Sequence, residues 1–67
     1  RSHSEYVEGE NLKDMIKEDL ISERIAIESY RDMIAFVGSD DPTTRRMLEK
    51  ILMKEEEHAE DLVSLLK

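Results

Sequence analysis

Two long helical patterns in this chain are separated by one short segment, Gly-Ser-Asp-Asp-Pro-Thr-Thr, which begins at Gly38. Gly38 directly follows the last periodic apolar residue, a position where glycine commonly ends a helix. Asp41 and Pro42 are typical of a helix start, with aspartate as N-cap and proline at the first helical position. Because the connection is short, the two helices should be antiparallel neighbours. The sequence therefore predicts an all-α, antiparallel two-helix hairpin, with a helix over about 11–37, a turn over 38–42 and a helix over about 43–66.

Apolar residues recur at spacings of three, four and seven on both sides of this turn, which is the period of an amphipathic helix. In the first helix these positions are Leu12, Met15, Ile16, Leu20, Ile27, Tyr30, Ile34 and Val37. In the second helix they are Met47 or Leu48, Ile51 or Leu52, and then Leu62, Leu65 and Leu66. Residues 1–10 are polar and contain Gly9, so we expect a tail or loop there, with Asn11 as the N-cap of the first helix.

The composition restricts the classes of partner. The chain has 17 acidic and 10 basic residues, a formal net charge of −7 and no cysteine. This charge argues against nucleic acid, whose phosphates select basic surfaces, and it suits cations. No apolar run is long enough to cross a membrane, and the lack of cysteine fits a cytoplasmic protein. Since 67 residues bury little apolar surface, we expect oligomerisation or a metal to contribute to stability. The chain begins without methionine, so we expect it to be processed or cut from something longer.

Three ionisable residues interrupt the apolar stripes. In the first helix the stripe that passes through positions 16 and 20 continues to Glu23. In the second helix the stripe through positions 48 and 51 continues to Glu55 and His58. We expect these three side chains to lie on buried faces, where an unpaired charge costs several kcal/mol and must be neutralised. The remaining glutamates of this region lie off the stripes or at their edges, as a solvated face: Glu28, Glu56, Glu57 and Glu60.

Glu23, Glu55 and His58 should also lie at one level of the hairpin. At about 1.5 Å per residue they are roughly 21, 20 and 24 Å from the turn. Glu55 and His58 are three residues apart and so project from one face of their helix. Carboxylate oxygens combined with imidazole suit iron, manganese or zinc. The sequence therefore predicts a metal site formed by these three residues, and the alternative is that they are paired by hydrogen bonds alone.

At these residues the chain resembles a known family. The segments EDLISERIAIESYRDMI and DDPTTRRMLEKILMKEEEHAEDLVSLL resemble the third and fourth helices of bacterioferritin-type, ferritin-like proteins. The similarity extends from about Tyr6 to the end of the chain. It implies that Glu55 is a bridging carboxylate of a di-iron site, and that Glu23 and His58 are terminal ligands. It also implies a catalytic role for these residues in oxidising ferrous iron with dioxygen or peroxide, followed by storage of the ferric product.

The resemblance covers only half of the family's four-helix bundle. The first two helices, with another Glu and another Glu-x-x-His, have no counterpart here. The haem-ligating methionine of bacterioferritins belongs to that part, so haem is assigned to none of the four methionines, which we expect to fill the core: Met15, Met33, Met47 and Met53. A two-fold homodimer would complete the bundle with four carboxylates and two imidazoles, whereas a fragment would belong to a longer subunit. The alternatives are a rubrerythrin-like di-iron peroxidase and a non-catalytic helical dimerisation module.

Overall fold

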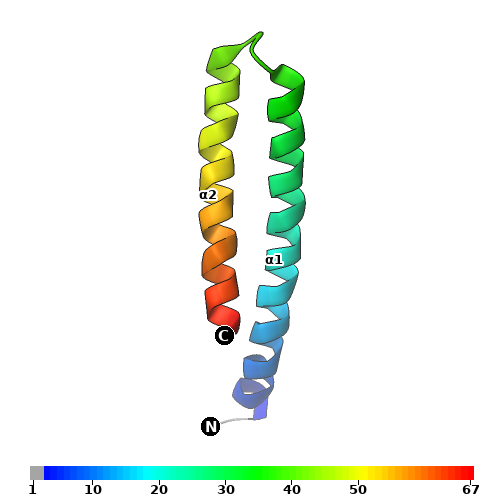
Figure 1. Cartoon of the computed structure of the whole chain (residues 1–67). Coiled ribbons are helices and arrows are strands. Elements are labelled where there is room, and N and C mark those ends of the chain that lie inside the picture. Colours follow the sequence, from blue (N-terminus) through cyan, green and yellow to red (C-terminus); the bar gives the residue numbers. More distant parts are fainter. Residues whose placement is uncertain (1–2) are drawn as a thin grey trace.

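The computed structural model describes the backbone of residues 3–67 and the side chains of residues 11–67. Helix α1 spans His3–Val37 and helix α2 spans Pro42–Leu66, and the two helices pack side by side as an antiparallel hairpin (Figure 1). The longer α1, with 35 residues against 25 in α2, extends past the C-terminus at the open end of the hairpin (Figure 1). The described residues contain no strand, and the predicted all-α hairpin is confirmed.

Hydrogen bonds fix both sides of the turn. The N–H of Gly38 donates to the carbonyl oxygen of Ile34 at 2.9 Å, and Gly38 has a φ of 56°, a left-handed conformation that favours glycine. Asp41 caps α2, since its side chain accepts a hydrogen bond from the N–H of Thr44 at 3.1 Å. Pro42 takes the first helical position, where its missing N–H leaves no intrahelical bond unmade. The helix therefore begins at Pro42, within the segment predicted as a turn.

The start of α1 differs from the prediction. Residues 3–10 are helical, so Asn11 lies inside the helix and is not its N-cap, and the expected tail or loop is wrong from His3 onward. Residues 1 and 2 lie outside the described part of the chain. One glycine costs a helix only about 1 kcal/mol relative to alanine, so Gly9 weakens this segment without ending the helix.

One row of side chains on each helix forms the hairpin core, with positions spaced alternately by four and three residues. On α1 this contact row consists of Ile16, Leu20, Glu23, Ile27, Tyr30 and Ile34. On α2 it consists of Leu48, Leu52, Glu55, Ala59, Leu62 and Leu66. All twelve residues are buried or half-buried, and the most buried are Leu20, Ile27, Leu48 and Leu62. This resolves the ambiguity of the sequence pattern at position 48, because Leu48 is buried and Met47 is exposed.

Part of the predicted core is on the surface. Leu12, Met15 and Leu65 belong to the expected stripes but are exposed, and Met33, Met47 and Met53 are exposed rather than buried in a core. The reason is geometric, because a single neighbouring helix covers only a narrow strip of each stripe. On another side of the hairpin, Arg31 Nη2 donates to Glu56 Oε2 at 2.8 Å and so links the two helices. Within the described part of the chain, neither helix has a stretch long and apolar enough to cross a membrane.

Candidate metal centre

The two contact rows bring Glu23, Glu55 and His58 together about midway along the hairpin. Glu23 comes from α1, and Glu55 and His58 come from successive turns of α2. One ligand atom from each of the three side chains lies within 4.8 Å of the others. The expectation that these residues meet at one level is therefore confirmed. The described residues hold one such group of three histidine or carboxylate side chains, so no further ligand joins it there.

The three side chains differ in burial. The Glu23 side chain is only 19% exposed, Glu55 is half-buried, and the His58 side chain is 56% exposed. The expectation that His58 lies on a buried face is therefore wrong for this hairpin. His58 immediately precedes the contact-row position Ala59, so its ring leaves α2 at the edge of the helix interface. The site is thus closed by α1 and α2 on one side and open beside His58.

Glu23 makes one polar contact and lacks another. Its Oε1 atom lies 3.3 Å from Nδ1 of His58, a pair that is a salt bridge only when the imidazole is protonated. Its Oε2 atom is buried and has no hydrogen-bond partner. A buried, unpaired carboxylate oxygen is costly, and most such atoms in proteins are satisfied by a donor, a water or an ion.

Glu55 responds electrostatically to this neighbour. When protonated, Glu55 can donate a hydrogen bond to the Glu23 side chain, and this raises the pKa of Glu55 above its ordinary value of 4.5. Partial burial and the negative charge of Glu23 raise this pKa further, while a positive charge on His58 lowers it. The raised pKa shows that a negative charge on Glu55 is unfavourable beside Glu23, and a bound cation could neutralise it.

The donor set fits a transition-metal ion. Two carboxylates and one imidazole are hard or intermediate ligands that suit iron, manganese and zinc. The unpaired Glu23 Oε2 atom supports the same fit, because it is a buried negative oxygen that faces its neighbours without a donor. Three ligands are too few to hold two ions by themselves, since the paired carboxylate sites of helical bundles use four carboxylates and two histidines.

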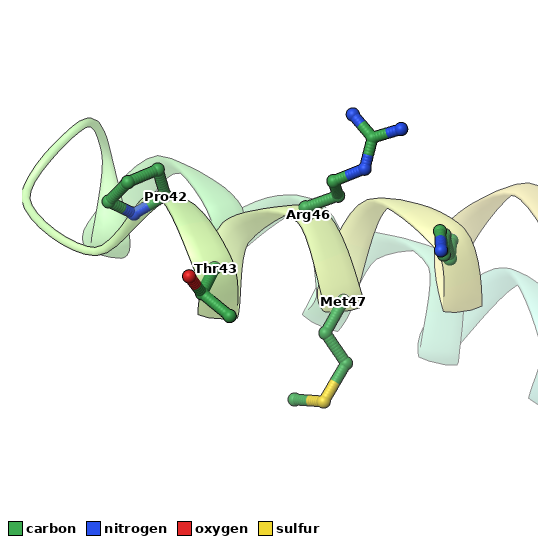
Figure 2. Close-up of a pocket in the computed structure, with 5 residues that line it drawn as sticks. Pro42, Thr43, Arg46 and Met47 are labelled. Atoms are coloured by element: carbon green, nitrogen blue, oxygen red, sulfur yellow. The ribbon is translucent and has the colours of Figure 1, made fainter.

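A separate depression on α2 is not a cation site. It is lined by Pro42, Thr43, Arg46, Met47 and Lys50, near the turn and away from the three candidate ligands (Figure 2). Its ionisable side chains are the two basic ones, which repel cations. Figure 2 also shows Met47 and Arg46 leaving α2 on different sides, so Met47 presents its thioether away from that positive charge.

The hairpin defines an all-α class of protein in which two carboxylates and one imidazole, a possible donor set for a metal ion, lie close together. A sequence model of the family described as Ferritin-like domain matches residues 2–67, almost the whole chain. The chain therefore belongs to the ferritin-like family. Searches of curated proteins and of solved structures found no match.

Proposed function

We propose that this chain binds ferrous iron through Glu23, Glu55 and His58 and contributes to its oxidation, as in a bacterioferritin-like protein. The observation that carries the proposal is the meeting of three ligand atoms within 4.8 Å around a buried carboxylate oxygen that lacks a partner. Membership of the ferritin-like family supports iron as the metal. Manganese and zinc suit the same donors and serve as probes.

Each residue has a distinct part in this proposal. Glu55 lies close to both Glu23 and His58, and the family resemblance assigns it the role of the carboxylate that bridges two ions. Glu23 supplies a buried oxygen, and His58 supplies a nitrogen at the open edge of the site. The His58–Glu23 contact orients the imidazole before an ion arrives.

The reaction needs a pair of iron ions as substrate. Two ferrous ions each give one electron to dioxygen, which takes up two protons and leaves as hydrogen peroxide; with peroxide as oxidant, the same two electrons produce water. Carboxylates stabilise the ferric products, since hard oxygen ligands favour the higher charge. In the proposal, storage or detoxification of ferric iron follows this oxidation.

Anaerobic titration with Fe(II) tests the binding step. The chain should bind iron, and Glu55→Ala should abolish binding because it removes the bridging carboxylate. Glu57→Ala is the matched control, because Glu57 is an exposed glutamate of the same helix that lies outside the cluster. Unchanged iron binding by the Glu55→Ala variant would refute the assigned role of Glu55. Admission of oxygen or peroxide to the loaded protein then distinguishes a ferroxidase, which accumulates ferric mineral, from a rubrerythrin-like peroxidase, which turns over peroxide without mineral.

One observation favours a second candidate, a metal-free helical module. The 3.3 Å contact between His58 and Glu23 would partly neutralise the site without an ion. If this is its role, the variant His58→Leu should change the thermal stability of the hairpin and show no change in its response to metals. If the metal proposal holds, His58→Leu should weaken iron binding.

A further inference from the structure

We infer that a second copy of this chain packs over the uncovered side of the hairpin, related by a two-fold axis that crosses the helices at the level of Glu23, Glu55 and His58. The inference rests on the proposed function only in giving the completed site its iron. The packing itself is argued from burial, spacing and charge.

The uncovered side is formed by two rows that lie next to the contact rows. Each position in these open rows immediately precedes a contact-row position, so both rows face the same side of the hairpin. On α1 the open row consists of Met15, Asp19, Ser22, Ala26, Ser29 and Met33. On α2 it consists of Met47, Ile51, Lys54, His58, Asp61 and Leu65. All but Ala26 and Ile51 are exposed, although the spacing of four and three residues is that of a helix seam.

The apolar members of the open rows are large and uncovered. Met15, Met33, Met47 and Leu65 are between 42% and 65% exposed. They flank the site, with small residues, Ser22, Ala26 and Ser29, between them on α1. Ile21 is exposed too, but it lies on the opposite side of the hairpin, where most of the neighbouring positions are charged, as in the Arg31–Glu56 pair. Ile25 lies on the outer side of α1. A seam shared by both helices, rather than one outer stripe, is what a second helical hairpin covers.

Apolar residues stand at similar distances on the two sides of the site. Met33 lies ten residues from Glu23 toward the turn, and Met15 lies eight residues away in the other direction, or about 15 and 12 Å. On α2, Met47 and Leu65 lie about 14 and 13 Å on either side of the midpoint between Glu55 and His58. A two-fold axis across the helices at this level therefore places the apolar residues between the site and the turn of one copy against the apolar residues on the other side of the site in the second copy.

Charge selects this axis over one that runs along the helices. A crossing axis lays α2 against α2 of the second copy, and Lys54 then lies within about two residues, or about 3 Å, of the level of Asp61 of the partner subunit. An axis along the bundle would instead lay α2 against α1 of the second copy, with Asp61 at the level of Asp19 of the partner subunit. Opposite charges across a helix seam stabilise it and like charges destabilise it, so the crossing axis is favoured.

This packing would complete the metal centre. Two copies of Glu23, Glu55 and His58 would meet at the axis and supply four carboxylates and two imidazoles, enough for a pair of ions. The exposed edge of His58 would become the inside of the bundle, and the exposed methionines would become core residues. The site of the single hairpin is thus one half of a symmetric site.

The test begins without metal. Sedimentation of the metal-free chain should show a dimer, and its unfolding temperature should rise with protein concentration, because the mass action of association stabilises only the folded dimer. Two ions should then bind per dimer. A metal-free dimer that binds no metal would support the packing and refute the proposed function. A monomer that binds one ion would refute the packing and support only the iron-binding step of the proposed function.

Matched variants locate the interface. Met47 and Met53 lie on α2 and are each 55% exposed, but only Met47 belongs to an open row. Met47→Glu should raise the dissociation constant of the dimer by about tenfold or more through loss of a buried apolar side chain, and Met53→Glu should not. If Met47→Glu unfolds the chain, circular dichroism across a concentration series still shows whether folding and association are coupled.

A charge exchange tests the axis. Lys54→Glu and Asp61→Lys should each weaken the dimer by about two- to fivefold, and the double variant should regain the lost affinity. The two residues are seven positions apart on one helix, too far for direct pairing within a chain. Equal dimerisation of Met47→Glu and Met53→Glu, or a double variant weaker than either single variant, would overturn the inference. A stable monomer that dimerises only when further helices are supplied in trans would show that another helical segment covers this side.

Discussion

At the scale of the residue, the main feature is the closeness of the Glu55 and Glu23 carboxyl groups, which raises the pKa of Glu55. Glu55 keeps its proton to a higher pH than usual because it can hydrogen-bond to Glu23. A carboxyl group whose pKa is raised in this way lowers the stability of the folded hairpin when it is ionised and no cation is bound. The three ligands are therefore expected to lower the stability of the metal-free hairpin and to raise that of the loaded one.

The variant Glu55→Gln tests whether the ionised carboxylate lowers metal-free stability while it provides metal binding. Glutamine resembles the protonated glutamate in shape and removes the negative charge beside Glu23. We expect the metal-free variant to unfold at a higher temperature than the unmodified chain at neutral pH, and to lose binding of Zn(II) or Fe(II). Thermal unfolding and a metal titration measure the two effects. A lower unfolding temperature with intact metal binding would contradict both parts.

The pH dependence of stability follows from two shifts of opposite sign. The hydrogen bonds from the Thr44 side chain and backbone lower the pKa of Asp41 from its ordinary value of 3.8, so its contribution is present above that value and is lost as the pH falls through the lowered pKa. The pKa of Glu55 is raised above 4.5, so its contribution is present at low pH and is lost as the pH rises through the raised pKa.

Metal-free stability should therefore decline as the pH rises above about the ordinary range of glutamate, and it should also decline in strong acid. Chemical unfolding measured at a series of pH values gives the profile. Glu55→Gln should flatten its upper limb, and Asp41→Asn should flatten its lower limb. A profile of the unmodified chain that rises steadily through this range would show that Glu23 does not raise the pKa of Glu55.

At the scale of the element, the turn is the most sharply defined part of the hairpin. Gly38 adopts a φ of 56°, and a Cβ added there would meet only the Ala35 carbonyl oxygen at 3.8 Å, an ordinary contact. The cost of a side chain at this position thus comes from the backbone conformation and not from a clash.

Gly38→Ala should destabilise the hairpin by about 1–2 kcal/mol, the cost of a left-handed conformation for an L-residue. Gly38→Asn should cost less, because asparagine adopts this conformation more readily. Urea unfolding of the two variants measures the difference. Equal stability of all three chains would mean that residue 38 changes conformation freely in solution.

Gly9→Ala tests the helical state of residues 3–10, where sequence and structure differ. In a helix, alanine is favoured over glycine by about 1 kcal/mol or less near an end. The variant should therefore gain helical signal in circular dichroism near 222 nm. Ser39→Ala, in the turn between the two helices, is the control. An unchanged signal would support the tail or loop that the sequence predicted.

At the scale of the whole molecule, a ligand that joins the two helices should stabilise the fold. An ion held by Glu23 from α1 and by Glu55 and His58 from α2 binds only when the helices are side by side. Zn(II) at a concentration a hundred times its dissociation constant should add about 2.7 kcal/mol to the free energy of unfolding. Thermal unfolding with and without Zn(II) measures this, and Glu57→Ala should keep the effect that Glu55→Ala loses.

Much of this molecule follows from the spacing of its residues. The turn, the two helices and the meeting of Glu23 with Glu55 and His58 were predictable, because the helical rise converts residue counts into levels. The start of α1 was not, since a polar segment with one glycine is a weak signal in either direction. The exposure of Met47 and His58 was not predictable either. The apolar stripe of α2 is wider than the strip that α1 covers, and the sequence does not indicate which part of the stripe contacts α1. The role of the three residues as metal ligands stays a prediction.

The short connection between the helices has a consequence for how this chain can vary. Gly38 ends one helix and Asp41 caps the next, and only Ser39 and Asp40 lie between them. One inserted residue that lengthened α2 would slide it by about 1.5 Å and rotate it by about 100°, which turns His58 away from Glu23. The turn contacts none of the three candidate metal ligands, yet its length sets the register of α2 against α1 and so their alignment. Related chains that use the same three residues should therefore tolerate substitutions in this turn more readily than insertions or deletions.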